Sequence, residues 1–191
     1  MNILGIFLAA ALIDNVLLMR FLGLCPFIGM SGDVNKSVGM GLAVTFVMVM
    51  ATVVTWPIYH FILVPLSLTF LQILVFILVI ASLVQLVEFY LKKNVPGLYA
   101  SMGIYLPLIT TNCAILAVTF DNISKGYSLF EAVIYAIGVA LGFMLAMVLM
   151  AGLRDRIKTA PIPKFLEGTP IIFAATSLLA TAFMGFSGLI K

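Results

Sequence analysis

The sequence predicts an all-α integral membrane protein with six transmembrane helices, arranged as two inverted repeats of three helices. Three observations lead to this prediction. The chain has 191 residues, of which 64% are hydrophobic and only 9% charged, whereas a soluble domain carries about 25% charged residues. Its apolar residues form long runs without charge, of the length that a membrane-crossing helix needs. Its lysines and arginines gather in alternate connections between those runs, as orientation signals do in membrane proteins.

The runs without Asp, Glu, Lys or Arg give the position of each span. Residues 37–87 contain none of these charges, which leaves room for two helices of about 20 residues each. The segment from Trp56-Pro57 to Pro65 indicates the turn between them, because proline interrupts helices. The first span carries Asp14, Asn15 and Arg20 but is otherwise apolar. We expect helices over residues 2–24, 38–59, 70–91, 94–120, 132–153 and 168–190.

The basic residues predict the orientation of these spans. The connections after the first, third and fifth spans hold seven lysines and arginines, whereas the other side holds only Lys125 and Lys191. Cytoplasmic loops carry the excess of positive charge. Both termini are therefore expected on the non-cytoplasmic side. Because no long basic run is interleaved with aromatic residues, nucleic-acid binding is not expected.

The two halves of the chain resemble each other within one polytopic membrane domain, with repeat 1 at about 1–95 and repeat 2 at about 96–191. Each half has a cysteine, Cys25 or Cys113, tied to its first helix, and a polar segment followed by a long span after it. Since three spans is an odd number, the second copy enters the membrane in the opposite sense. Inverted repeats of this type place functional sites near the midplane, on interrupted helices.

The two cysteines are the residues best suited to chemistry. Gly23 and Pro26 flank Cys25, and Thr111 and Asn112 precede Cys113, so the first and fourth helices should be interrupted near the thiols. Polar groups and irregular backbone at membrane depth are tolerated where they are buried in protein or line a cavity. Free cysteine is also a common packing residue, and that interpretation stays open here.

A metal centre at these cysteines requires a second chain. Zinc and iron–sulfur sites usually take four protein ligands, and this chain has two cysteines and one histidine. A thiolate-bound cluster would therefore be shared with a partner that supplies two more thiolates. A disulfide would need an oxidising compartment. An iron–sulfur cluster suits a site inside the bilayer better than zinc does.

Asp14 and Asn15 are candidates for an ion path, because ionisable groups inside a span are costly and often functional. Asp14 and Cys25 lie 11 residues apart, so on a continuous helix they would share a face. The alternative is that Asp14 simply pairs with Arg20 or with a neighbouring helix. The sequence has no motif for nucleotide binding or hydrolysis.

Four stretches resemble one family of membrane subunits: FLGLCPF at 21–27, GMGLA at 39–43, LPLITTNCA at 106–114 and FMGFSG at 183–188. They are similar to the A subunit of the Rnf complex (RnfA) and, more distantly, to the E subunit of the sodium-pumping NADH:quinone reductase. The resemblance covers essentially the whole chain, and the two cysteine motifs are its most specific parts. Ala117 departs from the pattern, since a glycine is expected soon after the second cysteine.

The resemblance implies a membrane subunit of an ion-translocating ferredoxin:NAD⁺ oxidoreductase in a prokaryotic cytoplasmic membrane. It implies that Cys25 and Cys113 ligate a 2Fe–2S cluster shared with a homologous subunit of opposite topology, the Rnf protein RnfE, with Gly23, Pro26, Thr111 and Asn112 supporting the site. Flavins and nucleotide would belong to the other Rnf subunits (B, C, D and G). The function expected is electron relay across the bilayer coupled to Na⁺ or H⁺ transport. Two alternatives are a cofactor-free inverted-repeat ion transporter and a structural membrane anchor.

Overall fold

The computed structural model describes residues 3–66, 69–94, 107–161, 163 and 167–185. Every regular element in this part of the chain is helical, as the sequence predicts. Three of these helical segments are long and apolar enough to cross a membrane: Val34–Leu63, Gln72–Phe89 and Leu129–Lys158. The helices Cys113–Ser124 and Thr169–Met184 are apolar but shorter.

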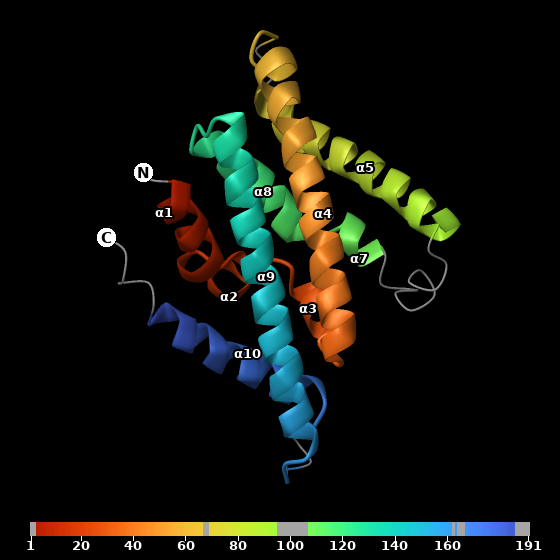
Figure 1. The fold of residues 1–191 in the computed structure, drawn as a ribbon, viewed down its shortest axis with the longest axis vertical. Coiled ribbons are helices and arrows are strands. Elements are labelled where there is room, and N and C mark those ends of the chain that lie inside the picture. Colours follow the sequence, from red (N-terminus) through yellow and green to blue (C-terminus); the bar gives the residue numbers. More distant parts are fainter. Residues whose placement is uncertain (1–2, 67–68, 95–106, 162, 164–166, 186–191) are drawn as a thin grey trace.

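Two long helices form the centre of the molecule. α4 (Val34–Ile58) and α9 (Leu129–Lys158) lie side by side and run in opposite directions (Figure 1). The Asp33 side chain caps α4 by accepting from the Asn35 N–H at 3.0 Å. A capping box between Ser128 and Glu131 begins α9. Such caps satisfy backbone N–H groups that a helix start leaves without partners.

The second helix continues a few residues further than the sequence predicts. Pro57 lies inside α4, and the chain stays helical through the π-helical turn η2 (Tyr59–Leu63). A proline within a helix removes one hydrogen bond, and a local π turn is a common adjustment to such an interruption. The predicted helix end at residue 59 is therefore four residues too early, and the chain turns at residues 64–66, within the connection expected between residues 59 and 70.

The first span is more broken than predicted. It consists of α1 (Ile3–Leu8), the π-helical turn η1 (Ala9–Ile13), α2 (Val16–Arg20) and α3 (Leu24–Met30). One break lies at Asp14 and Asn15, and the other at Phe21 and Gly23, whose φ angles are 55° and 81°. The break before Cys25 confirms the interruption expected there. The continuous helix over residues 2–24 is wrong, and with it the argument that Asp14 and Cys25 share a helical face.

The fourth span is also interrupted where the sequence predicts. Two residues separate α7 (Pro107–Thr110) from α8 (Cys113–Ser124). The earlier part of the predicted span, residues 95–106, lies outside the described residues. The break places Asn112 as the cap of α8, where its side-chain oxygen accepts from the Ala114 N–H at 3.0 Å.

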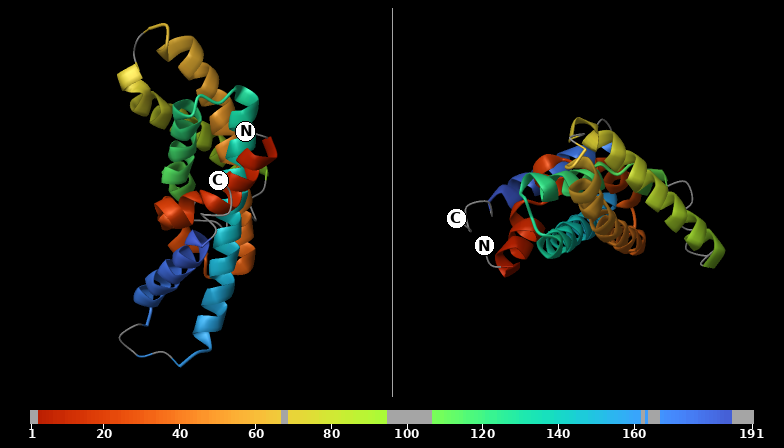
Figure 2. Two further views of the ribbon diagram at one scale, coloured as in Figure 1. Left: turned by 90° about the vertical axis from the view of Figure 1, so that its left-hand side faces the viewer. Right: turned by 90° about the horizontal axis from the view of Figure 1, so that it is seen from above.

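Two further helices spread away from the central pair. α5 (Gln72–Asn94), preceded by the short turn η3 (Thr69–Leu71), and α10 (Thr169–Met184) point to opposite sides of the molecule in Figures 1 and 2. α5 exposes large apolar side chains, including Leu78 and Leu86, and Phe70 just before it is exposed as well. Large apolar side chains exposed along one helix in this way are typical of a surface that contacts lipid or another protein.

Candidate functional site

Both cysteines lie at the start of a short helix, immediately after a break. Gly23 caps α3, so Cys25 is its second residue, and Cys113 is the first residue of α8. Both thiols are free and exposed. Pro26 is buried in the first turn of α3, a position where proline costs little because its missing N–H has no helical partner. It therefore begins this helix instead of interrupting it.

Gly23 brings the two cysteine segments together. A Cβ atom added at Gly23 would lie 3.0 Å from Asn112 Oδ1, 3.5 Å from the Ala114 Cβ and 2.9 Å from a ring carbon of Phe143. Asn112 and Ala114 are the two neighbours of Cys113, and Gly23 is two residues from Cys25. The fold thus packs the break before one cysteine against the break before the other, although 88 positions separate the cysteines in the sequence.

The surroundings of Cys113 are open. Its Sγ lies 3.9 Å from the carbonyl oxygen of Thr111, itself an exposed residue. A groove of about 280 Å³ runs beside it, lined by Thr111, Asn112, Cys113 and Leu116 together with Ile77, Ile80 and Ala81 of α5. An exposed thiol beside an apolar groove is accessible to a second protein chain.

The donor set fits half of an iron–sulfur site. No group of three or more His, Cys, Asp or Glu side chains that could hold a metal ion occurs among the described residues. Two free, exposed thiols from adjacent segments are what one protein contributes to a cluster that takes four thiolates. The described part of the chain thus offers two of the four thiolates that such a cluster takes.

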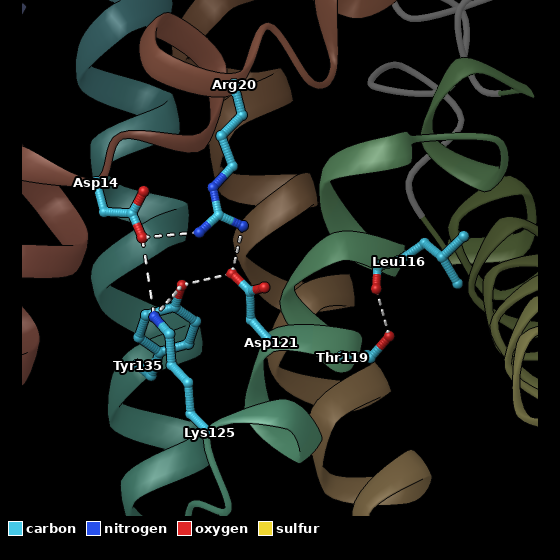
Figure 3. A network of polar contacts seen from close by, with 7 residues as sticks. All are labelled: Asp14, Arg20, Leu116, Thr119, Asp121, Lys125 and Tyr135. Atoms are coloured by element: carbon cyan, nitrogen blue, oxygen red, sulfur yellow. Dashed lines mark hydrogen bonds and ion pairs between the residues drawn. The ribbon is translucent and has the colours of Figure 1, made fainter. Parts of the chain in front are cut away.

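A cluster of charged residues joins the first span to the second half of the chain (Figure 3). Arg20 donates from Nη2 to Asp14 Oδ2 at 3.0 Å and from Nη1 to Asp121 Oδ2 at 2.7 Å. The Tyr135 hydroxyl donates to the same Asp121 oxygen at 3.0 Å. Lys125 Nζ lies 3.8 Å from Asp14 Oδ2 and donates to the Tyr135 hydroxyl at 3.3 Å. We call these five residues the charge cluster.

The charge cluster balances two carboxylates with two cations. Such pairing is how ionised groups are accommodated away from water. Asp14 therefore pairs with Arg20, one of the two alternatives left by the sequence, and its role in an ion path stays a prediction. Outside the spans, partial burial and the nearby Glu131 raise the pKa of Tyr127 further above its ordinary value.

Both polar atoms of the Asn15 side chain bond to protein. Its Nδ2 donates to the Gly142 carbonyl at 2.9 Å, and its Oδ1 accepts from the N–H groups of Leu17 and Leu18 at 3.1 and 3.4 Å. Asn15 thus caps α2 and fixes the break in the first span against α9. These contacts give it a structural role, and its part in an ion path stays a prediction too.

Sequence reasoning missed Asp121, Lys125 and Tyr135 as members of a site. Asp121 lies one residue beyond the charge-free run that defines the fourth span, so in the sequence it only marks the end of that run. Its partner Arg20 is 101 positions away, and no periodicity links the two. The one available signal was that Arg20 sits inside an apolar span, where a charge needs a partner.

The amino-acid sequence of this chain is similar to a family model and to known proteins over almost its whole length. A family model described as "Rnf-Nqr subunit, membrane protein" matches residues 3–190. The A subunit of the ion-translocating oxidoreductase complex of Syntrophotalea carbinolica is 52% identical over 189 residues, or 99% of this chain and 98% of that protein.

Two further relatives are named for a coupling ion. The A subunit of the Na⁺-translocating ferredoxin:NAD⁺ oxidoreductase complex of Acetobacterium woodii is 51% identical over 99% of this chain and 98% of its own length. The A subunit of the proton-translocating ferredoxin:NAD⁺ oxidoreductase complex of Clostridium ljungdahlii is 49% identical over 98% and 97% of the two chains.

Proposed function

Since the chain belongs to the Rnf-Nqr family of membrane subunits, we propose that it is the A subunit of an ion-translocating ferredoxin:NAD⁺ oxidoreductase in a prokaryotic cytoplasmic membrane. Relatives named in this way match almost the whole chain. Because the relatives named for Na⁺ and for protons are about equally similar to it, the proposal covers either cation. The chain is not catalytic alone and acts within the complex.

We propose six spans in two inverted repeats, with both termini on the non-cytoplasmic side. Three long apolar helices and two shorter ones, together with the interrupted first span, support this number in the described residues. The matching breaks before Cys25 and Cys113 support the repeat. The excess of lysine and arginine in alternate connections supports the orientation.

We further propose that Cys25 and Cys113 hold half of a 2Fe–2S cluster, the other half being held by RnfE, a homologous protein of opposite topology. The observation that carries this proposal is that the fold packs the two breaks together through Gly23 and Asn112 while leaving both thiols exposed. When bound, such a cluster supplies one-electron transfer.

The chain's own residues prepare this position. Asn112 caps α8 and so fixes the start of the helix at Cys113, its first residue. The positive end of the α8 dipole lies at Cys113 and favours negatively charged sulfur there. Gly23 allows the approach of the two segments that a side chain would prevent. The remaining partners, the B, C, D and G subunits, would carry the flavin and nucleotide sites, and the bilayer surrounds the apolar faces.

The test is iron content and electron paramagnetic resonance of this chain purified anaerobically with RnfE. The wild-type pair should contain about two irons and give a reduced-cluster signal. Cys25→Ser and Cys113→Ser should each lose both iron and signal. Ala117→Ser, one turn along α8 from Cys113, introduces the same hydroxymethyl group and should retain both.

Two outcomes would reject this proposal. An intact pair without iron would mean that both cysteines are packing residues, and would favour a cofactor-free ion transporter. Ion flux through the purified chain in vesicles would then support the transporter. Iron that survives both cysteine substitutions, with unchanged ferredoxin-dependent NAD⁺ reduction, would leave this chain as a structural anchor.

A further inference from the structure

Asn122 is a buried polar side chain without a partner. It lies in α8 next to Asp121 of the charge cluster, and only 2% of its surface is exposed. Neither Nδ2 nor Oδ1 has a hydrogen-bond partner among the described residues. Its backbone carbonyl is satisfied by the Tyr127 N–H at 3.1 Å, so the deficit belongs to the side chain alone. Buried amides almost always have partners, and an exception indicates an ordered water or another ligand.

The two unpartnered atoms specify what the ligand must do. Nδ2 needs an acceptor and Oδ1 needs a donor. A water molecule provides both at once. A metal cation would bind Oδ1 but cannot accept a hydrogen bond from Nδ2. An anion would accept from Nδ2 but cannot donate to Oδ1. The chemistry of this side chain therefore indicates water.

Three buried hydroxyl groups lie on α8 and on the helix that packs against it, α4. Thr119 lies three residues before Asn122 in α8, and Thr52 and Thr55 lie near the C-terminal end of α4. Figure 3 shows Thr119 with its partner Leu116 on α8. The two helices contact each other, and Trp56 Nε1 donates to the Tyr127 carbonyl at 2.9 Å at that end.

Each of these hydroxyls already uses its proton within its own helix. Thr119 donates to Leu116 O at 2.8 Å, Thr52 to Met48 O at 2.9 Å and Thr55 to Ala51 O at 2.7 Å. Their oxygens therefore remain available as acceptors. A water that donates to such oxygens can make the three or so hydrogen bonds that a buried water usually has.

A second unpartnered amide lies further along the same face of α8. Asn112, Ile115, Thr119 and Asn122 are spaced by three, four and three positions, which puts them on one side of a helix. All four are buried. Asn112 Nδ2 also lacks a partner among the described residues, and Asn112 contacts the Gly23 position beside the cysteines. The apolar Ile115 separates the two polar ends of this face.

We propose that Asn122 binds internal water in the interface between α4 and α8, and that this water forms a hydrated section of the coupling-ion path between the charge cluster and the cysteine breaks. The water site is inferred from the buried, unpartnered amide of Asn122 alone. Its place in an ion path rests on the proposed function. Ile115, between the hydrated end and Asn112, is the dry position that a passing cation or proton would have to cross.

The water site is tested on a cryo-electron microscopy map of the purified complex at a resolution that shows ordered water. A density peak within hydrogen-bond distance of both Asn122 Nδ2 and Oδ1 is expected. Asn15 serves as the internal control, because its Nδ2 and Oδ1 each bond to protein, so no water should bridge the two atoms. A map in which Asn122 has no water, or in which another residue bonds both amide atoms, would overturn the site.

The ion path is tested by transport in vesicles that contain the complex. Asn122→Leu should keep the iron content and NAD⁺ reduction but lower cation transport per electron by about tenfold, since the water loses its polar anchor. Asn122→Ser, which keeps a hydroxyl and leaves more room for water, should recover much of the transport. Thr176→Val in α10 is the matched control. The Thr176 side chain is similarly buried, and its hydroxyl donates to Ile172 O within the same helix.

The outcomes separate the two proposals. Unchanged transport in Asn122→Leu would overturn the path, even if the map shows the water. A wild-type pair without iron would reject the proposed redox function but leave the water peak at Asn122 as a valid observation. Loss of iron in Asn122→Leu, but not in Thr176→Val, would show that Asn122 supports the fold of the site and would also overturn the path.

Discussion

Substitution of Gly23 by alanine should destabilise the protein by disrupting the contact between the two cysteine segments. Two costs add at this position. The φ angle of 81° lies in the left-handed region, where a Cβ costs about 1–2 kcal/mol. The new Cβ would also lie 2.9 Å from the Phe143 ring and 3.0 Å from Asn112 Oδ1, and overpacking of this kind typically costs about 1–3 kcal/mol. The expected loss is therefore about 2–5 kcal/mol.

Gly126 is the matched control for the backbone term. It also has a positive φ angle, 63°, but a Cβ there would meet nothing within 4 Å. Gly126→Ala should cost about 1–2 kcal/mol from backbone strain alone. The difference between the two variants, about 1–3 kcal/mol, isolates the close approach of the cysteine segments.

The assay is the thermal midpoint of the purified pair in one detergent at one scan rate. For a chain of this size, 1 kcal/mol shifts the midpoint by about 2–4 °C, so Gly23→Ala should melt about 2–12 °C below Gly126→Ala. Iron content, measured on the same samples, should fall in Gly23→Ala only. Equal midpoints would show that the segments do not pack as described, and an equal loss of iron in both variants would show that the cluster responds to general destabilisation.

Two more substitutions test the anchoring of the first span. Gly142→Ala would place a Cβ against the backbone of η1, closer than atoms approach without movement, so it should cost about 1–3 kcal/mol. Gly152→Ala, in open space on the same helix, should be neutral or stabilise by up to about 1 kcal/mol; a similar midpoint for both would contradict the packing. Arg20→Gln should lower stability by about 1–2 kcal/mol, because it leaves two carboxylates without their shared partner in a half-exposed cluster. The exposed Arg156→Gln should change it by less than about 0.5 kcal/mol, and thermal midpoints that match would exclude a stabilising charge cluster.

The sequence was sufficient for what depends on local patterns. Charge-free runs located the long helices to within a few residues, as in α9, because lipid excludes charge from a span whatever the tertiary structure. Both breaks near the cysteines were predictable, since Gly23 and Asn112 are residues that end or cap helices. The end of the second helix was placed four residues too early, because proline indicated a nearby boundary whereas a π-helical turn continues the helix past Pro57 to Leu63.

What could not be predicted depends on contacts between distant segments. The break at Asp14 and Asn15 follows from tertiary contacts, because Asn15 bonds both to α2 and to the Gly142 carbonyl 127 positions away. The pairing of Arg20 with Asp121 and the isolation of Asn122 have the same origin. A single sequence shows that a charge in a span needs a partner, but it does not show which element brings one.

Two arginines connect the halves of the chain in a reciprocal way. Arg154, from the second half, donates through Nη1 to Ile28 O and to the Ser31 hydroxyl, both at 2.9 Å; these residues lie at the end of α3, the helix that begins beside Cys25. Arg20, from the first half, bonds to Asp121 near the end of α8, the helix that begins at Cys113. Each cysteine-bearing helix is therefore held at its far end by an arginine from the other half. A movement of one half against the other would have to break these contacts or carry both partners along. This arrangement gives the chain a direct mechanical link between the thiols and the ionised groups near the two ends of the central helices.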